Sequence, residues 1–257
     1  MRFHKKVEDI LEKTEKRIAD AKSKPLPKQK FERRSFKSAI SRKPFSIISE
    51  IKFSSPSKGE IRRKEQDGIA EIARQMEDGK ADALSVLSEP SFFGGTFENV
   101  SIAKKAAKLP VMMKDFFIDR FQMEIAEAYG ADAVLLMVSV LGEKTKEFLD
   151  EAKRRKLDCL VECVSEEEVK IAVDSNAEII GINNRSFSDF SVDLRRTEAL
   201  SKFVPEEKIL VCESGIGNNG DIKRLLPFGV DAFLVGSSIM ETESVSEKLL
   251  QLRGKEQ

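Results

Sequence analysis

Short apolar runs alternate with amphipathic stretches along most of the chain. Between the runs, apolar residues recur every three or four positions, as in 69–76 and 148–152, which is the periodicity of a helix that buries one face. Strands that alternate with helices in this way pair in parallel through right-handed crossovers. The expected strands are Ile47–Lys52, Ala83–Leu87, Pro110–Lys114, Ala133–Met137, Asp158–Glu162, Ile179–Ile182, Ile209–Cys212 and Ala232–Val235.

A weak internal repeat favours a closed barrel over an open sheet. An acidic residue precedes an apolar run in ADALSVL (81–87), ADAVLLM (131–137), AEIIGIN (177–183) and VDAFLVG (230–236). The repeats lie about fifty residues apart, or two βα units, and mark every second strand, which suits an eight-fold barrel. We therefore predict an α/β fold, a (β/α)8 TIM barrel, with residues 1–257 as a single domain.

The segment before the first strand has a different pattern. Apolar residues between positions 6 and 22 have helical spacing, with charged residues on the other face. Because acidic residues interleave with the basic ones, packing against the protein's own body is favoured over binding to a membrane surface. Pro25 and Pro27 end this helix, and a polar connection follows up to residue 44. The expected organisation is an N-terminal helical extension over 1–44 and a barrel over 45–257.

Charge and composition exclude several functional classes. Lys plus Arg and Asp plus Glu both number 44, so no basic excess indicates nucleic-acid binding. One histidine, His4, and three cysteines, Cys159, Cys163 and Cys212, provide neither a metal site nor a disulfide framework. No long apolar run indicates a signal peptide or a membrane span. We therefore expect a cytoplasmic protein with buried, inert cysteines and without a metal, cofactor, membrane or nucleic-acid partner.

Charged residues gather where the expected strands end, which is where such a barrel places its active site. Glu50 and Lys52 share one side of the first strand, and charges within an apolar strand are costly to bury without a function. Lys114 closes the third strand and Glu162 closes the fifth. A structural ion pair and a snorkelling surface lysine are the alternatives. If Glu162 points into the barrel mouth, the cysteines of its strand face the helix layer.

The later strand ends carry groups that suit anions. Asn183 and Arg185 share parity in GINNRSF (181–187), and the arginine fork fits phosphate or carboxylate. Gly-rich turns follow the seventh and eighth strands, at the usual phosphate site of such barrels. The SSPSKG segment after the first strand supplies hydroxyls for an anion, or a lid. GIGNNG (215–220) also matches a dinucleotide fingerprint, but it lies in the seventh βα unit rather than an early one, which argues against that interpretation.

These segments together resemble the indole-3-glycerol-phosphate synthases. The resemblance covers residues 45–240, and the N-terminal helix is similar to the extra helix that the family carries before its barrel. The chain departs from the family at Ser186, where the family usually has Asp, and in VGSS, where many members have an acidic residue after the Gly. The matching segments, in the family's order and spacing, are ISEIKFSSPSKGEI (48–61), LSVLSEPSFFGGTFEN (84–99), PVMMKDFFIDRFQ (110–122), GADAVLLM (130–137), CLVECVSEEE (159–168), GINNRSF and ESGI (213–216).

The resemblance implies a carboxy-lyase of tryptophan biosynthesis, which closes an indole ring without metal or cofactor. The substrate would be 1-(2-carboxyphenylamino)-1-deoxyribulose 5-phosphate, and the products indole-3-glycerol phosphate, CO2 and water. Lys114 would be the general acid and Glu162 its acid–base counterpart. The other implied site residues are Lys52 and Glu50 as assistants, Asn183 and Ser214 as orienting groups, and Ser55, Pro56, Phe93, Phe116, Arg185, Gly215, Gly236 and Ser237 as substrate or phosphate contacts.

That chemistry needs acids and a base in one site. A positioned ammonium can protonate the ketone that the ring carbon attacks, and after loss of CO2 a hydroxyl leaves as water with acid help and removal of a proton. Lys52, Lys114, Glu50 and Glu162 provide both kinds of group. A neighbouring cation and partial burial are expected to lower the pKa of a lysine here. The residues leave open which lysine serves which step.

Two other functions were weighed. Another phosphate-binding barrel enzyme, such as phosphoribosylanthranilate isomerase or the tryptophan synthase α subunit, would share the late phosphate loops but not the EIK, KDF and LVE segments together. A non-catalytic phosphosugar-binding or partner-binding barrel would have lost its acids and bases, which this chain keeps. The expected partner is a small phosphorylated substrate. A monomer, a weak homo-oligomer and an association with other tryptophan-pathway enzymes all stay open.

Overall fold

The computed structural model describes residues 3–41, 44–62 and 68–255, and the other positions, including 42–43 of the predicted extension, lie outside the described residues. Eight parallel strands close into a barrel, so the predicted TIM barrel is confirmed. Each strand matches its prediction to within one residue at both ends. In order around the barrel the strands are β1 (Ser46–Ile51), β10 (Ala232–Val235), β9 (Ile209–Glu213), β8 (Ile179–Asn183), β7 (Asp158–Cys163), β6 (Ala133–Met137), β5 (Val111–Lys114) and β4 (Ala83–Leu87).

Alternate strand residues divide between two apolar layers, as the two-residue period of a strand requires. Leu135, Leu160 and Leu234 point into the barrel, where they form one buried cluster. Their chain neighbours, such as Val134 and Val161, point outward and pack under the helices. Residues at the ends of the strands therefore point into the mouth of the barrel when they share the parity of the inner layer.

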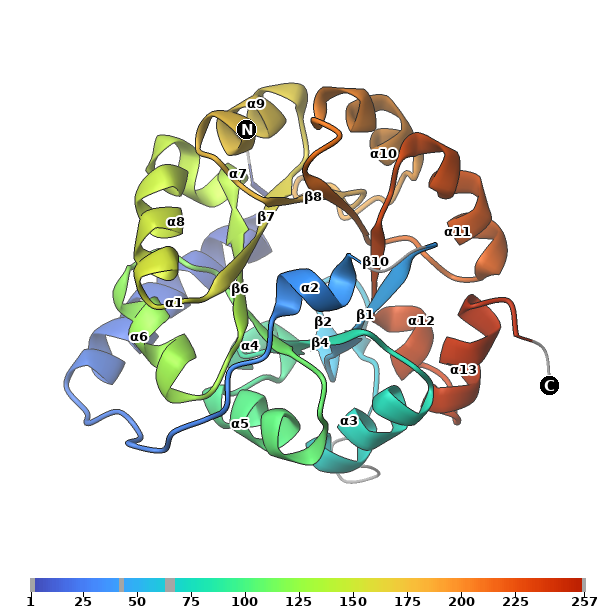
Figure 1. Ribbon diagram of the computed structural model, residues 1–257. Coiled ribbons are helices and arrows are strands. Elements are labelled where there is room, and N and C mark those ends of the chain that lie inside the picture. The colour runs from blue at the N-terminus through green and yellow to red at the C-terminus, as the bar shows by residue number, and fades with distance from the viewer. Residues whose placement is uncertain (1–2, 42–43, 63–67, 256–257) are drawn as a thin grey trace.

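Helices surround the barrel in the ring that Figure 1 shows. The predicted amphipathic pattern is confirmed in α3 (Ile69–Asp78), whose buried residues are those of the apolar stripe. No helix within the described ranges is long and apolar enough to span a membrane. The other outer helices are α5 (Phe97–Ala106), α6 (Phe121–Ala128), α8 (Thr145–Arg154), α9 (Glu166–Asp174), α10 (Arg195–Leu200), α11 (Asn219–Leu225) and α13 (Val245–Leu252), with short helices α4 (Pro90–Phe93), α7 (Val138–Leu141) and α12 (Ser237–Met240) and 3-10 turns at Gly142–Lys144, Ser201–Phe203 and Leu226–Phe228.

The predicted polar connection up to residue 44 is wrong in part, because it contains the short helix α2 (Phe36–Ile40). Ser35 caps this helix by accepting a hydrogen bond from the Ser38 N–H. Phe36 and Ile40 are fully buried and join the inner apolar cluster at the N-terminal ends of the strands. A single helical turn with two large apolar residues is too short to show as a period within a polar segment.

The long N-terminal helix α1 (Lys5–Lys22) lies at the opposite end of the barrel. In Figure 1, α2 lies in front of the barrel and α1 runs behind it. The His4 N–H donates to the Phe187 carbonyl after β8, and Lys6 Nζ donates to the Pro56 carbonyl after β1. Val7, Ile10 and Ile18 are buried, so the prediction that this helix packs on the protein's own body is confirmed.

The acidic residues of the sequence repeat lie at the N-terminal ends of the strands, away from α1. Asp82, Asp132 and Asp231 each accept the backbone N–H of a residue at the start of the neighbouring strand, at 2.8–2.9 Å. These bonds satisfy strand-end donors that would otherwise be unpaired. The repeat therefore stabilises the closed barrel, and the charged residues at the other end of the strands are left to form a site.

Candidate active site

A cavity of about 430 Å³ opens at the C-terminal end of the barrel. All of the predicted site residues line it except Ser55 and Pro56, which lie in the loop beside its mouth. The structure thus brings together residues from the ends of seven of the eight barrel strands or the loops that follow them. The predicted residues that line the cavity are Glu50, Lys52, Phe93, Lys114, Phe116, Glu162, Asn183, Arg185, Ser214, Gly215, Gly236 and Ser237.

Two lysines share one glutamate in this cavity. Glu50 points inward from β1, and its Oε1 lies 2.7 Å from Lys52 Nζ while its Oε2 lies 2.9 Å from Lys114 Nζ. Burial raises the pKa of Glu50, but the charges of Lys114 and Lys52 and the hydrogen bonds from both bring that pKa down to about 2. Glu50 is therefore an anion that holds both ammonium groups in place.

A further glutamate, Glu213 at the end of β9, was not predicted as a site residue. It is fully buried, and its Oε2 lies 3.4 Å from Lys114 Nζ. The signal was present in the sequence, because Glu213 has the parity of Ile209 and Val211, which point into the barrel. The ESGI segment was instead interpreted as a turn for phosphate.

Glu162 and Glu213 form a pair of carboxyl groups with raised pKa. Burial is the main cause of the raised pKa of both groups. For Glu213, the negative charge of Glu162 is the next cause. Lys114 and a hydrogen bond with Asn183 act in the opposite direction on Glu162. The Oε1 atoms of both glutamates are buried without a hydrogen-bond partner. The pair is suited to hold one proton that can be given up or taken back during a reaction.

The expectation that a neighbouring cation lowers the lysine pKa is wrong for Lys114. Burial lowers the pKa of Lys114, but the carboxylates of Glu50, Glu213 and Glu162 outweigh it and raise the pKa above its usual value. The expectation considered a neighbouring cation and burial. It did not consider the carboxylates that three other strands bring close to Lys114. The Lys114 side chain is therefore protonated at neutral pH and has a proton to donate.

Two glycines make room for the glutamates. A Cβ at Gly181 would lie 2.2 Å from Glu213 Oε1, and a Cβ at Gly236 would lie 2.4 Å from Glu50 Oε1. Gly236 was predicted as a phosphate contact, and its position also explains why no larger residue fits beside Glu50. Side chains at these positions would displace the carboxylates from the lysines.

The other side of the cavity carries the polar residues of the later strands. Asn183 Oδ1 accepts the Arg185 N–H at 2.9 Å, and the Arg185 guanidinium donates to the Phe190 carbonyl at 3.0 Å and to Ser57 Oγ at 3.4 Å. Ser214 has a φ of 65°, in the left-handed region that is rare for residues other than glycine. This strained turn presents Ser214 and Gly215 to the cavity.

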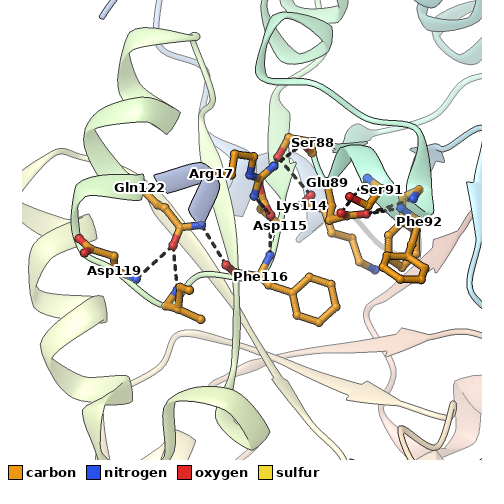
Figure 2. Close-up of polar contacts among 12 residues, drawn as sticks. Arg17, Ser88, Glu89, Ser91, Phe92, Lys114, Asp115, Phe116, Asp119 and Gln122 are labelled. Carbon is orange, nitrogen blue, oxygen red and sulfur yellow. Dashed lines mark hydrogen bonds and ion pairs between the residues drawn. The ribbon is translucent and has the colours of Figure 1, made fainter. Parts of the chain in front are cut away.

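An apolar wall faces the charged groups. The rings of Phe93 and Phe116 lie 6.4 Å apart between centroids, and Leu135, Met137 and Leu234 continue the wall. The carboxylate of Glu89 accepts the N–H groups of residues 91–93 and so holds the backbone that leads to Phe93. Figure 2 shows Glu89 beside Ser91 and Phe92. A planar apolar group would fit against this wall while its polar substituents face the lysines.

The loop after β1 forms a small hairpin of β2 (Ser54–Ser55) and β3 (Gly59–Glu60). Ser55 Oγ accepts the Lys58 N–H at 3.2 Å within this turn. Lys58 also forms an ion pair with Glu241, which follows the neighbouring strand β10 and helix α12. Lys58 and Glu241 both line the cavity, although neither was predicted as a site residue.

The cysteines take no part in the site. Cys159 and Cys163 belong to the apolar layer under the helices, as predicted. Burial raises the pKa of the thiols, to about 11 for Cys212. Within the described ranges, no group of His, Cys, Asp and Glu side chains is arranged to hold a metal ion.

The fold and the cavity define a class: a (β/α)8-barrel enzyme that sets ammonium groups and glutamates against an apolar wall and glycine-containing turns. The family model for indole-3-glycerol phosphate synthase matches residues 2–252. The chain belongs to the indole-3-glycerol phosphate synthase family, as the sequence predicted.

Three relatives of that family illustrate the match. The indole-3-glycerol phosphate synthase of Methanocaldococcus jannaschii is 48% identical over 79% of this chain and 76% of its own length. That of Caldanaerobacter subterraneus subsp. tengcongensis is 43% identical, over 85% of this chain and 86% of its own. That of Aliarcobacter butzleri is 38% identical, over 94% of this chain and 90% of its own.

Solved structures with low sequence identity show the same fold. Thiamine phosphate pyrophosphorylase from Pyrococcus furiosus superposes with a TM-score of 0.62 at 19% identity, covering 82% of this chain and 94% of its own. A mutant tryptophan synthase α subunit from the same organism gives 0.61 at 12% identity, covering 81% and 98%. These similarities concern the barrel alone.

Proposed function

We propose that this chain converts 1-(2-carboxyphenylamino)-1-deoxyribulose 5-phosphate into indole-3-glycerol phosphate, CO2 and water. The observation that carries the proposal, beside family membership, is that Lys52 and Lys114 contact the same glutamate, Glu50, within one cavity. Acids, a carboxylate base, an apolar wall and anion-binding turns are all needed for this reaction, and all line this cavity.

Ring closure is assigned to Lys114. The aromatic ring would lie on the wall of Phe93 and Phe116, with the ketone oxygen toward the Lys114 ammonium. The ring carbon that bears the carboxylate attacks the ketone carbon, and the ketone oxygen takes a proton from Lys114 as its charge develops. Glu50 keeps the ammonium in position through its 2.9 Å contact.

Decarboxylation and dehydration complete the reaction. The carboxylate leaves as CO2, and its bonding electrons restore the aromatic ring. The new hydroxyl then leaves as water with a proton from an ammonium group, for which Lys52 is the second donor. A proton on the carbon next to the nitrogen goes to a carboxylate, a role for Glu162, whose partner Glu213 shares its proton.

The phosphate is assigned to the later strands. Arg185, Gly215, Gly236 and Ser237 line the cavity, and loops after the seventh and eighth strands commonly bind phosphate in this fold. Asn183 and Ser214 also line the cavity, where they would orient the sugar hydroxyls. We also propose a reducing, cytoplasmic setting, which suits the three cysteines, all free and buried.

The test is direct. The purified chain is incubated with the carboxyphenylamino substrate, and the appearance of indole fluorescence is followed. Turnover supports the proposal. Binding without turnover would instead indicate a phosphosugar-binding barrel, and no response to this substrate would direct attention to another phosphate-binding barrel enzyme.

A further inference from the structure

We propose that Arg17, on the N-terminal helix α1, is a positioning residue for Lys114 and Phe116, acting through Asp115. The inference deepens the proposed function and rests on it for its kinetic readout. Arg17 is remote in sequence from every strand end and does not line the cavity. Its contacts nevertheless reach the backbone that carries the lysine.

The Arg17 guanidinium makes two bonds at the ends of neighbouring strands. Nη2 donates to Asp115 Oδ1 at 2.7 Å, and Nη1 donates to the Ser88 carbonyl at 2.7 Å. The Arg17 side chain is 18% exposed and that of Asp115 is fully buried. Figure 2 shows the guanidinium between Ser88 and Asp115. A buried, forked contact of this kind is far more constraining than a surface ion pair.

Asp115 is hydrogen-bonded to Phe116 directly and to Lys114 through Ser88. Its Oδ1 also accepts the Phe116 N–H at 2.8 Å, and its Oδ2 accepts Ser88 Oγ at 2.6 Å. The Ser88 N–H in turn donates to the Lys114 carbonyl at 3.0 Å. The peptide groups before and after Asp115 are thus tied to one network, with the Arg17 guanidinium as its cation.

The rest of the segment is held independently of Arg17. Gln122 donates from Nε2 to the Phe116 carbonyl at 2.9 Å and accepts the Ile118 N–H at 2.8 Å (Figure 2). Loss of Arg17 would therefore act on the Lys114–Phe116 backbone rather than unfold the whole loop. A carboxylate left in a buried position without its cation either shifts or draws in water. Either change moves the ammonium relative to Glu50 and the ketone.

The experiment compares Arg17→Met with Lys22→Met. Lys22 lies on the same helix and pairs with Asp119 of the same loop at 2.5 Å, but both side chains are more than one-third exposed and neither residue lines the cavity. We expect Arg17→Met to lower kcat by about 10- to 100-fold, because a misplacement of ~1 Å can cost that much. KM should change by less than about threefold, and Lys22→Met should leave both constants within about twofold.

Two further variants separate positioning from general destabilisation. In an Asp115→Asn background, position 115 has no carboxylate that needs the Arg17 cation. Adding Arg17→Met to that background should therefore lower kcat by less than about threefold. Arg17→Lys keeps the charge without the fork and should recover part of the kcat. All assays are run well below the melting temperature of each variant. An unchanged kcat for Arg17→Met, or a loss of the same size in both backgrounds, overturns the proposal.

Amide hydrogen exchange distinguishes this failure from failure of the proposed function. If the parent chain does not turn the substrate over, the proposed function fails, and the Phe116 N–H still reports on the network because it donates to Asp115. Its exchange should be faster in Arg17→Met than in Lys22→Met. Equal exchange in the two variants would contradict the positioning role without any reference to catalysis.

Discussion

Two buried lysines at opposite ends of the barrel have very different surroundings. Lys104, on α5, lies among the N-terminal ends of the strands and is 2% exposed. Its Nζ bonds both oxygens of Asp132, at 2.7 and 2.5 Å. Those oxygens also accept the N–H groups of Arg34 and Val111. Asp132 is therefore the counter-ion of Lys104, and each of its two oxygens accepts two donors.

Lys114, at the other end, faces more carboxylate than it can neutralise. Glu50, Glu162 and Glu213 all raise its pKa, and two of these glutamates keep an oxygen without a partner. Burial is instead the main cause of the lowered pKa of Lys104. A buried charge alone therefore does not mark an active site. An excess of like charges beside an open cavity does.

The largest effect should come from removing the lysine in the cavity. Lys114→Ala is expected to lower kcat by about 10²–10⁴-fold, the worth of a positioned general acid, with a modest change in KM. Steady-state rates from indole fluorescence measure this. A kcat within about threefold of the parent would remove Lys114 from its assigned role.

Lys104→Met is the matched control at the other end of the barrel. Breaking a buried pair leaves Asp132 without its cation, so unfolding should become easier by about 3–5 kcal/mol. The kcat at a temperature below the melting transition should stay within about twofold of the parent. A large loss of kcat in the folded variant would erase the distinction between the two lysines.

The fold was largely predictable from local pattern, because the strands bury both faces and read as continuous apolar runs. Parity put Glu50 and Lys52 on one side of their strand, and position at a strand end favoured Lys114 and Glu162; all four line the cavity. What parity cannot give is the distance between strands that are far apart in the sequence. The raised pKa of Lys114 depends on Glu50 and then on Glu213, which is 99 residues away along the chain.

The missed features have the same physical origin. The helix α2 is a single turn whose stability comes from burying Phe36 and Ile40 against the barrel, not from its own propensity. Arg17 was one charge on an amphipathic helix, and only the folded chain brings it to Asp115. Tertiary contacts decide these positions, and a single sequence carries little trace of them.

Arg185 tests whether the cavity separates binding from chemistry. Its guanidinium bonds the Phe190 carbonyl and the Ser57 hydroxyl. A charge-assisted hydrogen bond to phosphate is worth about 1.5–3 kcal/mol, so Arg185→Ala should raise KM by about 10- to 100-fold with little change in kcat. A loss confined to kcat would place Arg185 with the reacting groups instead.

A substitution at Gly181 can move the carboxylate of Glu213 without removing that carboxylate. The added methyl of Gly181→Ala would lie 2.2 Å from Glu213 Oε1, the far end of a side chain that can move. We expect the glutamate to shift, so that kcat falls by about tenfold at the same KM. Gly68→Ala, where a Cβ meets nothing within 4 Å, is the control and should behave like the parent.

The smallest expected effect concerns the pH dependence of stability. Because the pKa values of Glu162 and Glu213 are raised in the folded protein, the folded state binds more protons than the unfolded state between the ordinary carboxyl pKa and the raised one. Stability contributed by this pair is therefore present at low pH and is lost as the pH rises through that window.

Glutamine at position 213 cannot ionise, and Lys114 keeps Glu50 and Glu162 as partners. Glu213→Gln should accordingly melt higher than the parent at pH 8 by a few degrees, with the difference shrinking toward pH 4. If scanning calorimetry gave the same difference at both values, the excess of carboxylate would carry no electrostatic cost, and the contrast between the two ends of the barrel would rest on geometry alone.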